Sequence, residues 1–120
     1  TIIELTGSVQ PANEIDGTSL VSLLKKDRME TRPLFWHYPH YSNQGAWPGS
    51  AVRLGKYKLV DNFEKDRQEL YDLENDLSET TDISAVNPQK TRELYDLLKA
   101  WRKETGALMM IPNPEWKDRP

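Results

Sequence analysis

The stretch Leu34-Phe-Trp-His-Tyr-Pro-His-Tyr41, followed by Trp47-Pro-Gly-Ser-Ala-Val-Arg-Leu-Gly-Lys-Tyr-Lys-Leu-Val60, decides the fold of this chain. Its first part places four aromatic residues and two histidines within eight positions. Aromatic rings that carry a polar group are unfavourable both fully exposed and fully buried. This stretch therefore indicates a strand with one face packed in the protein and the other in contact with solvent. The aromatic content predicts a strand over 34–38 that ends at Pro39.

The second part predicts a tight hairpin. Two short runs, 50–54 and 57–61, are separated only by Gly55-Lys56. A two-residue connection is typical of antiparallel hairpins, and glycine at its first position favours a type II′ turn. After a polar connection, the segment 69–73 alternates like a third paired strand.

A long amphipathic helix is predicted after these strands. Asn87-Pro88 favours a helix start, because asparagine caps helices and proline suits the first helical position. Apolar residues then recur at the spacing of one helix face: Leu94, Leu97, Leu98 and Trp101. Gly106 ends the helix, and 107–111 is apolar enough for a last strand. The predicted fold class is α+β, a small antiparallel sheet of about four strands packed against one long C-terminal helix.

The beginning of the chain has a different pattern. Residues 1–7 resemble the last turns of a helix closed by Gly7, and neither an initiator methionine nor a signal peptide is present. A natural chain seldom starts inside a helix. We therefore expect this chain to be a piece of a larger protein.

A short helix is expected next, with an apolar side formed within 20–24 and a cap from Asp16 or Thr18. The mixed charges that follow indicate a solvated linker. We assign residues 1–32 to the tail of a preceding domain and residues 33–120 to a C-terminal α+β subdomain.

Composition excludes several classes of function. The formal net charge of -3 offers no basic excess for nucleic acid. No apolar run approaches the roughly 18 residues of a membrane span. Because the chain has no cysteine, it has no disulfide, thiolate zinc site or cysteine nucleophile.

His37 and His40 are the only histidines. Pro39 lies between them and argues against a helix, while on a strand they would point to opposite sides. A two-histidine metal site therefore lacks geometry, and it lacks nearby carboxylates. Two interpretations stay open: hydrogen-bonded histidines within a packed aromatic segment, or contact with a substrate. Imidazole and ring faces both suit sugars and sulfate oxygens.

Tyr41 and Trp47 flank a loop of small polar residues, so they either bind a ligand or pack back onto the sheet. Three cations of the hairpin could likewise form an anion patch: Arg53, Lys56 and Lys58. The alternation favours a solvent face for these cations, with the apolar hairpin residues inward. The inward residues are Val52, Leu54, Tyr57 and Leu59.

The acidic segment 69–82 has a faint calcium-loop pattern but lacks the glycine at the sixth place and the glutamate at the twelfth. A solvated acidic turn is the better interpretation. Neither a phosphate-binding loop nor a nucleophile elbow is present.

Five segments in register resemble bacterial sulfatases of the arylsulfatase A type, within the alkaline-phosphatase-like superfamily. They are Thr1–Gly7, Ile15–Leu24, Trp36–Tyr41, Ala51–Leu59 and Glu69–Leu73. The resemblance covers nearly the whole chain, and the final helix with its Pro-Asn-Pro tail fits as well.

The resemblance implies a parent enzyme that hydrolyses sulfate esters of a sulfated carbohydrate or an aryl sulfate. Such sulfatases use a formylglycine, made within a C/S-x-P-S/A-R motif, beside a calcium ion. This sequence lacks that motif. The resemblance therefore places formylglycine and calcium in a preceding catalytic domain, and implies that this fragment holds no cofactor and is inactive alone.

The same resemblance implies that the fragment braces the catalytic domain and lends a loop to the substrate cleft. His37 and His40 match histidines of a segment near the mouth of the pocket in relatives. Together with the two loop aromatics, the expected substrate-binding residues are His40, His37, Tyr41 and Trp47. It also implies an exported bacterial parent, periplasmic or extracellular.

The alternative is a free-standing carbohydrate-binding or protein-interaction module without catalysis. A helix that closes a domain at residue 1 favours the fragment over this module. Residues 1–24 also hold too many large apolar side chains for a surface tail. In the fragment alone they fold back on the sheet, stay disordered or pair with another copy, so self-association of the fragment is one expected outcome.

Overall fold

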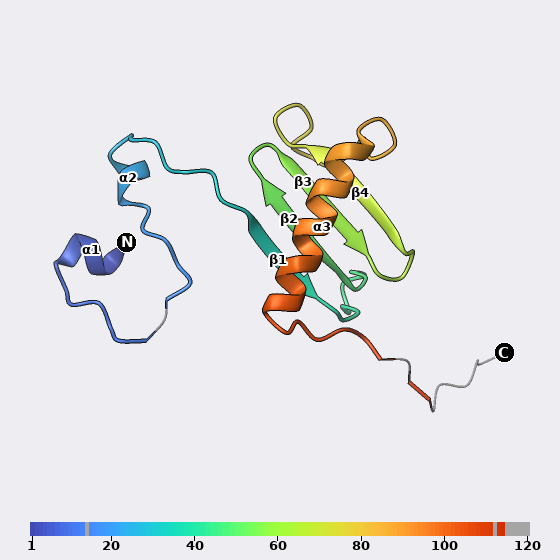
Figure 1. Ribbon diagram of the computed structural model, residues 1–120, viewed down its shortest axis with the longest axis horizontal. Helices are drawn as coiled ribbons and strands as arrows, with labels where there is room; N and C mark the ends of the chain where they lie inside the picture. Colours follow the sequence, from blue (N-terminus) through green and yellow to red (C-terminus); the bar gives the residue numbers. More distant parts are fainter. Residues whose placement is uncertain (14, 112, 115–120) are drawn as a thin grey trace. The chain divides into compact units, whose positions relative to one another are not determined.

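The computed structural model describes residues 1–13, 15–111 and 113–114. The chain divides into two compact units, residues 1–31 and residues 32–120. The elements, in chain order, are α1 (Ile2–Thr6), α2 (Val21–Leu24), β1 (Leu34–Tyr38), β2 (Gly49–Leu54), β3 (Tyr57–Asn62), β4 (Arg67–Asp72) and α3 (Pro88–Glu104) (Figure 1).

The first unit holds two short helices. Gly7 closes α1 in the left-handed conformation, with φ of 64°, as the sequence predicts. The predicted cap of α2 is wrong: Leu20 precedes the helix, and neither Asp16 nor Thr18 caps it. Both lie too far from the first turn, because an N-cap side chain must come directly before it. The backbone N–H of Leu20 donates instead to Thr1 Oγ1 at 2.8 Å.

The second unit is built on a four-stranded antiparallel sheet in the order β1-β2-β3-β4. The predicted hairpin is confirmed, since Leu54 pairs with Tyr57 across a two-residue turn. Gly55 has φ of 61° and Lys56 does not have positive φ, which fits a type II′ turn. The third predicted strand is β4, which begins two residues earlier than its pattern indicated.

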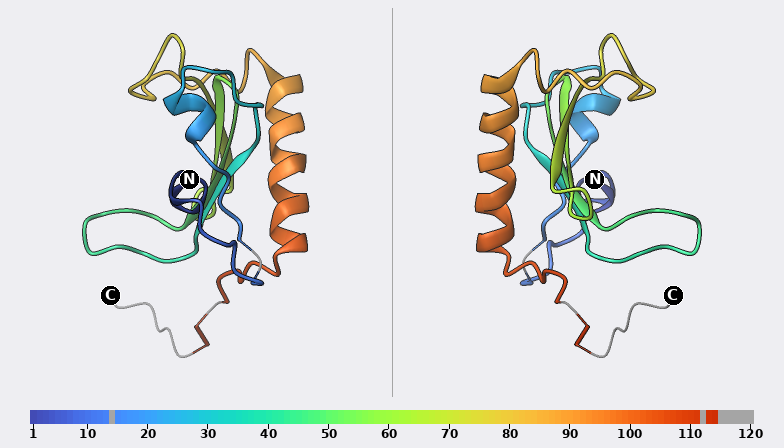
Figure 2. Two further views of the ribbon diagram at one scale, coloured as in Figure 1. Left: turned by 90° about the vertical axis from the view of Figure 1, so that its left-hand side faces the viewer. Right: turned by 90° about the vertical axis from the view of Figure 1, so that its right-hand side faces the viewer.

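Helix α3 lies along one face of the sheet and completes the predicted α+β fold class (Figures 1 and 2). Asn87 caps it by accepting from the backbone N–H of Lys90. Five fully buried side chains form the core: Val52, Leu59, Leu70, Leu94 and Leu98. Trp101 stacks on Phe35 of β1 with ring centroids 4.7 Å apart, so the predicted apolar stripe of the helix does face the sheet.

A buried ion pair fixes the end of α3. Arg102 Nη1 donates to Asp61 Oδ2 of β3 at 2.9 Å, with side chains only 11% and 6% exposed. Gln68 donates to the other oxygen of the same carboxylate at 2.8 Å. Because removing one partner would leave a buried charge uncompensated, this pair ties the register of the helix to the sheet.

The predicted last strand over 107–111 is wrong. The chain leaves α3 through Gly106, with φ of 62°, and 107–111 has no strand pairing. Its contact with the sheet comes from a side chain, since His37 bonds the carbonyl of Leu108. A backbone ladder is needed for a strand, and Leu108 and Ile111 stay 82% and 89% exposed. Within the described residues, no helix combines the length and apolarity needed to cross a membrane.

The other face of the sheet stays open within residues 32–120, because no described helix of this unit covers it. The loop 39–48, between β1 and β2, projects from the sheet on the side away from α3 (Figure 2). The loop 73–87 leads from β4 to α3 at the opposite end of the sheet. These two loops and the open face form the candidate site.

Candidate functional site

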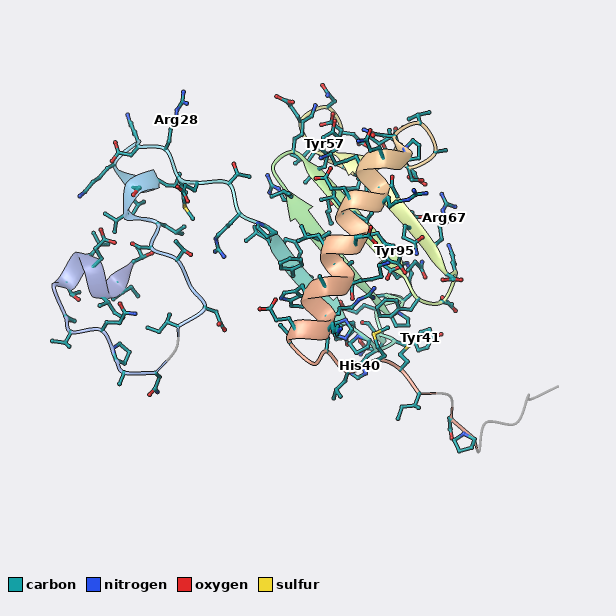
Figure 3. The ribbon with its side chains drawn as sticks, in the orientation of Figure 1. Arg28, His40, Tyr41, Tyr57, Arg67 and Tyr95 are labelled. Carbon is teal, nitrogen blue, oxygen red and sulfur yellow. The ribbon has the colours of Figure 1, made fainter. Side chains whose placement is uncertain are left out.

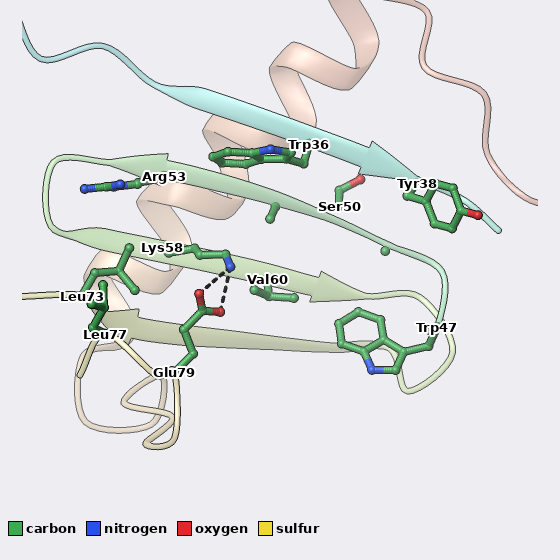
Figure 4. A pocket seen from close by; sticks show the side chains of 12 residues that line it. Trp36, Tyr38, Trp47, Ser50, Arg53, Lys58, Val60, Leu73, Leu77 and Glu79 are labelled. Atoms are coloured by element: carbon green, nitrogen blue, oxygen red, sulfur yellow. Dashed lines mark hydrogen bonds and ion pairs between the residues drawn. The ribbon is translucent and has the colours of Figure 1, made fainter. Parts of the chain in front are cut away.

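The open face of the sheet holds a cavity of about 490 Å³, here named the open-face cavity (Figure 4). Alternate residues of a strand point to the same side, so β1, β2 and β3 each line it with every second residue; Ser50 is the exception, because its hydroxyl bonds His37 of the neighbouring strand. Its lining consists of Trp36, Tyr38, Trp47, Gly49, Ser50, Ala51, Arg53, Lys58, Val60, Leu73, Leu77 and Glu79.

Aromatic rings form one wall of this cavity. Trp36 and Tyr38 of β1 are 51% and 52% exposed. Trp47 lies near the end of the loop 39–48 and packs over Gly49, where an added Cβ would lie 2.7 Å from the indole. Gly49 therefore lets the ring lie flat against β2, and Trp47 packs onto the sheet while still lining the cavity.

The charges of the cavity are mostly paired. Lys58 Nζ donates to both carboxylate oxygens of Glu79, at 2.6 and 2.7 Å (Figure 4). Lys56, outside the cavity, pairs with Asp72 at 2.9 Å, and this hydrogen bond lowers the pKa of the Asp72 carboxyl. Arg53 Nε donates to the carbonyl of Gly55, and no carboxylate of the described residues pairs with its guanidinium. Of the three cations in the hypothesised anion patch, only Arg53 therefore has no carboxylate partner among the described residues.

Carboxylates hold the loop 73–87 that carries Leu77 and Glu79. Asp82 accepts from the backbone N–H of Leu70 at 3.0 Å and from Arg67 at 2.8 Å. Burial opposes ionisation of Asp82, but these hydrogen bonds outweigh it and lower its pKa to about 2. The interpretation of this segment as a solvated acidic turn is therefore incomplete. Its carboxylates also accept hydrogen bonds that fix the conformation of the loop.

His37 lies on the α3 side of the sheet and has two short hydrogen bonds. Its Nε2 is 2.7 Å from the carbonyl oxygen of Leu108, and its Nδ1 is 2.7 Å from Ser50 Oγ. A carbonyl only accepts, so Nε2 carries the proton and a neutral ring accepts from the Ser50 hydroxyl at Nδ1. Ser50 is only 4% exposed. These contacts favour the structural interpretation of His37.

His40 and Tyr41 lie at the end of the sheet where α3 finishes (Figure 3). His40 is exposed and meets Tyr38 edge to face, with centroids 5.4 Å apart. Tyr41 is 66% exposed, and its hydroxyl reaches Glu64 Oε1 at 3.5 Å.

The four residues expected to bind substrate therefore do not form one cluster. His40 contacts Tyr38, which lines the open-face cavity, and Trp47 lines that cavity as well, while His37 faces the other side. Sequence reasoning missed Trp36 and Tyr38 as cavity residues. The sequence pattern could have identified both residues, because aromatic residues at alternate positions of a predicted strand lie on the same face.

The comparisons with known proteins agree with this architecture. Residues 1–105 match the family described as N-sulphoglucosamine sulphohydrolase, C-terminal. The chain belongs to this sulfatase family. The predicted sulfatase resemblance is thereby confirmed, and nothing in the comparisons supports a free-standing module.

In each of the individual relatives, most of the chain lies outside the matched region. A sulfatase of Formosa agariphila is 36% identical over 123 residues, which cover 89% of this chain and 22% of the relative. BT4656, solved in complex with its substrate D-glucosamine-2-N,6-O-disulfate, superimposes with a TM-score of 0.69 at 25% identity, covering 88% of this chain and 23% of that one. BT1596, a 2-O GAG sulfatase, shares the fold with a TM-score of 0.69 at 24% identity, covering 95% and 26%. The chain thus spans about a quarter of the length of these relatives.

The described residues of this sulfatase domain do not suit the calcium that the family implies. Residues 1–13, 15–111 and 113–114 contain no group of three or more His, Cys, Asp or Glu side chains that could hold a metal ion. The carboxylates of the acidic segment accept hydrogen bonds from backbone N–H groups and cations instead.

Proposed function

We propose that this chain is the C-terminal part of a longer sulfatase that hydrolyses sulfate esters on a sulfated carbohydrate. The match of residues 1–105 to a sulfatase family carries this proposal. It extends to an arylsulfatase-type parent whose catalytic domain contains formylglycine and calcium. It also extends to export of that parent to the periplasm or the cell exterior, as expected for a bacterial sulfatase of this kind.

The role proposed for this chain is to brace the catalytic domain and to lend the loop 39–48 to the substrate cleft. His40 supports the second part, because it is exposed at the start of that loop and rests on Tyr38. An imidazole in this position can hydrogen-bond a sugar hydroxyl or a sulfate oxygen.

Tyr41 and Trp47 belong to the same proposed contact surface, since each presents a ring from the loop that His40 opens. His37 contributes indirectly: its bonds to Ser50 and Leu108 hold the strand from which the loop departs. In this proposal His37 is a positioning residue.

Kinetics of the full-length parent test the loop. His40→Ala is expected to lower kcat/KM on the sulfated sugar about tenfold, which corresponds to ~1.4 kcal/mol of transition-state binding. The melting temperature should stay unchanged, because His40 is exposed. Asn43→Ala, an exposed position of the same loop, is the matched control and should retain full activity. A His40→Ala enzyme with full activity and a lowered melting temperature would contradict the role.

Sulfate release tests the enzyme class. The parent is expected to release sulfate from a glucosamine sulfate, and this chain alone should release none above a buffer blank. Turnover by the isolated chain, or no release by the parent from any sulfated sugar or aryl sulfate, would remove the proposed function.

A further inference from the structure

The tip of the loop 39–48 is hydrogen-bonded within itself. The backbone N–H of Ser42 donates to the carbonyl of Ala46 at 3.0 Å, and the N–H of Gly45 donates to the carbonyl of Ser42 at 3.1 Å. These two bonds set the shape of the tip, and both lie within the loop. The direction in which the loop projects from the sheet (Figure 2) is therefore set where its two arms meet other elements.

Both arms of the loop meet residues 63–66, which connect β3 to β4 and are here named the β3–β4 turn. On the returning arm, the carbonyl of the fully buried Pro48 accepts from the backbone N–H of Phe63 at 3.1 Å. On the departing arm, the hydroxyl of Tyr41 reaches Glu64 Oε1 at 3.5 Å. One short turn thus contacts the loop on both sides.

A buried asparagine fixes the conformation of this turn. Asn62 is the last residue of β3 and only 1% exposed. Its Oδ1 accepts from the backbone N–H groups of Glu64 and Lys65, each at 3.1 Å. A side-chain oxygen bonded to the backbone two and three residues further on holds the chain in a turn. This side chain therefore controls how the turn presents its remaining groups to the loop.

The ring of Phe63 attaches the turn to the end of α3. The guanidinium carbon of Arg102 lies 5.3 Å from the centroid of this ring, and the ring of His37 lies 5.9 Å from it. Arg102 is itself held by its buried ion pair with Asp61. The turn is therefore a fixed reference point, connected on one side to the core and on the other to the loop 39–48.

We propose that the β3–β4 turn positions the loop 39–48 for substrate binding, with Asn62 and Glu64 as the positioning residues. This inference rests on the role proposed above for the loop, and it adds the residues that hold the loop in place. Asn62 acts through Phe63 on the returning arm, and Glu64 acts through Tyr41 on the departing arm. Misplacing a group by about 1 Å from a remote site can cost about a hundredfold in rate, so a turn that holds the loop is measurable in kinetics.

Glu64→Ala in the full-length parent tests the departing arm. The KM for the sulfated sugar should rise about threefold with kcat unchanged, because a displaced loop loses substrate binding. A merely structural role would do the reverse, since a loss of folded enzyme lowers the apparent kcat and leaves KM as it was. Glu64→Gln keeps an acceptor for the Tyr41 hydroxyl and should recover most of the loss. Lys65→Ala, at the next exposed position of the same turn, is the matched control and should leave KM unchanged.

A double-mutant cycle tests whether Glu64 acts through Tyr41. Tyr41→Phe and Glu64→Ala should each raise KM, and the double variant should raise it no further than the larger single effect. Residues that act through one contact are not additive, whereas independent effects multiply. Multiplied effects on KM would contradict the link between the two side chains.

Hydrogen exchange in the full-length parent tests the returning arm without any need for turnover. Asn62→Ala should speed amide exchange in the peptide 39–48 at least about threefold, because the turn no longer holds the carbonyl of Pro48. Exchange in the peptide of α3 should stay as it is in the unaltered parent, and mass spectrometry reads both. Equal acceleration of the two peptides would mean that Asn62 supports the whole fold, and it would overturn its role as a positioning residue.

The two measurements together separate this inference from the proposed function. An active parent whose KM ignores Glu64→Ala and whose loop exchange ignores Asn62→Ala overturns the inference and keeps the function. A parent that releases no sulfate, yet whose loop exchanges faster in Asn62→Ala, removes the function and keeps the role of the turn in holding the loop.

Discussion

Single residues show how two histidines three positions apart come to lie in different surroundings. His37 sits within β1 and uses both ring nitrogens, on Ser50 and on the carbonyl of Leu108. His40 follows Pro39 and is exposed. The sequence predicts this contrast only in part. Pro39 marks the end of the strand, but nothing local indicates that residue 108, far along the chain, would supply a carbonyl.

His37→Ala should destabilise the purified chain by about 2 kcal/mol, because it leaves the buried Ser50 hydroxyl without its partner and frees the 108 carbonyl from the sheet. Urea unfolding at pH 7 measures this loss. His40→Ala is the control and should unfold at nearly the same urea concentration as the unaltered chain. Equal stability of the two variants would show that the hydrogen bonds of His37 contribute nothing net.

At the scale of elements, local sequence patterns predict the strands, turns and helices that depend on neighbouring residues. The strand 34–38, the hairpin and the helix stripe follow from alternation, a two-residue turn and helical spacing, and all three are confirmed. The last strand over 107–111 fails although β1 and β4 are edge strands, because apolar residues alone do not pair a segment with an edge, and the Leu108 carbonyl bonds the His37 side chain instead. The Lys58–Glu79 ion pair could not be predicted from the sequence either. It joins residues 21 positions apart, and the conformation of the loop 73–87 brings Glu79 to Lys58.

The hairpin turn gives a test of backbone conformation. Gly55 has φ of 61°, and an added Cβ would meet nothing within 4 Å. Gly55→Val should therefore cost about 1 kcal/mol or more from backbone strain alone, since a β-branched residue rarely adopts positive φ. Gly55→Asn is the matched control and should lose less, because asparagine tolerates positive φ. Chemical denaturation compares the two; equal losses would mean that the turn is not strained by the larger side chain.

At the scale of the whole molecule, both units present apolar surface. In residues 1–31, Val21 is buried, with 4% exposure, although the sequence grouped it with the residues in need of a partner. Six other large apolar side chains of this unit remain exposed, by 46% or more: Ile2, Leu5, Val9, Leu20, Leu23 and Leu24. In residues 32–120 the open-face cavity adds exposed rings. Such surface is compatible with a piece that is covered in a longer parent.

Without a parent, these side chains should bring copies of the chain together, because association removes apolar area from water at about 25 cal/mol per Å². Static light scattering across a concentration series should show the average mass rising with concentration. Deleting residues 1–31 should weaken this rise. Leu24→Glu should weaken it as well, whereas Leu108→Glu, at 82% exposure in the other unit, should not. A mass equal to one chain at every concentration would show that the exposed side chains of the first unit find their partners within a single copy.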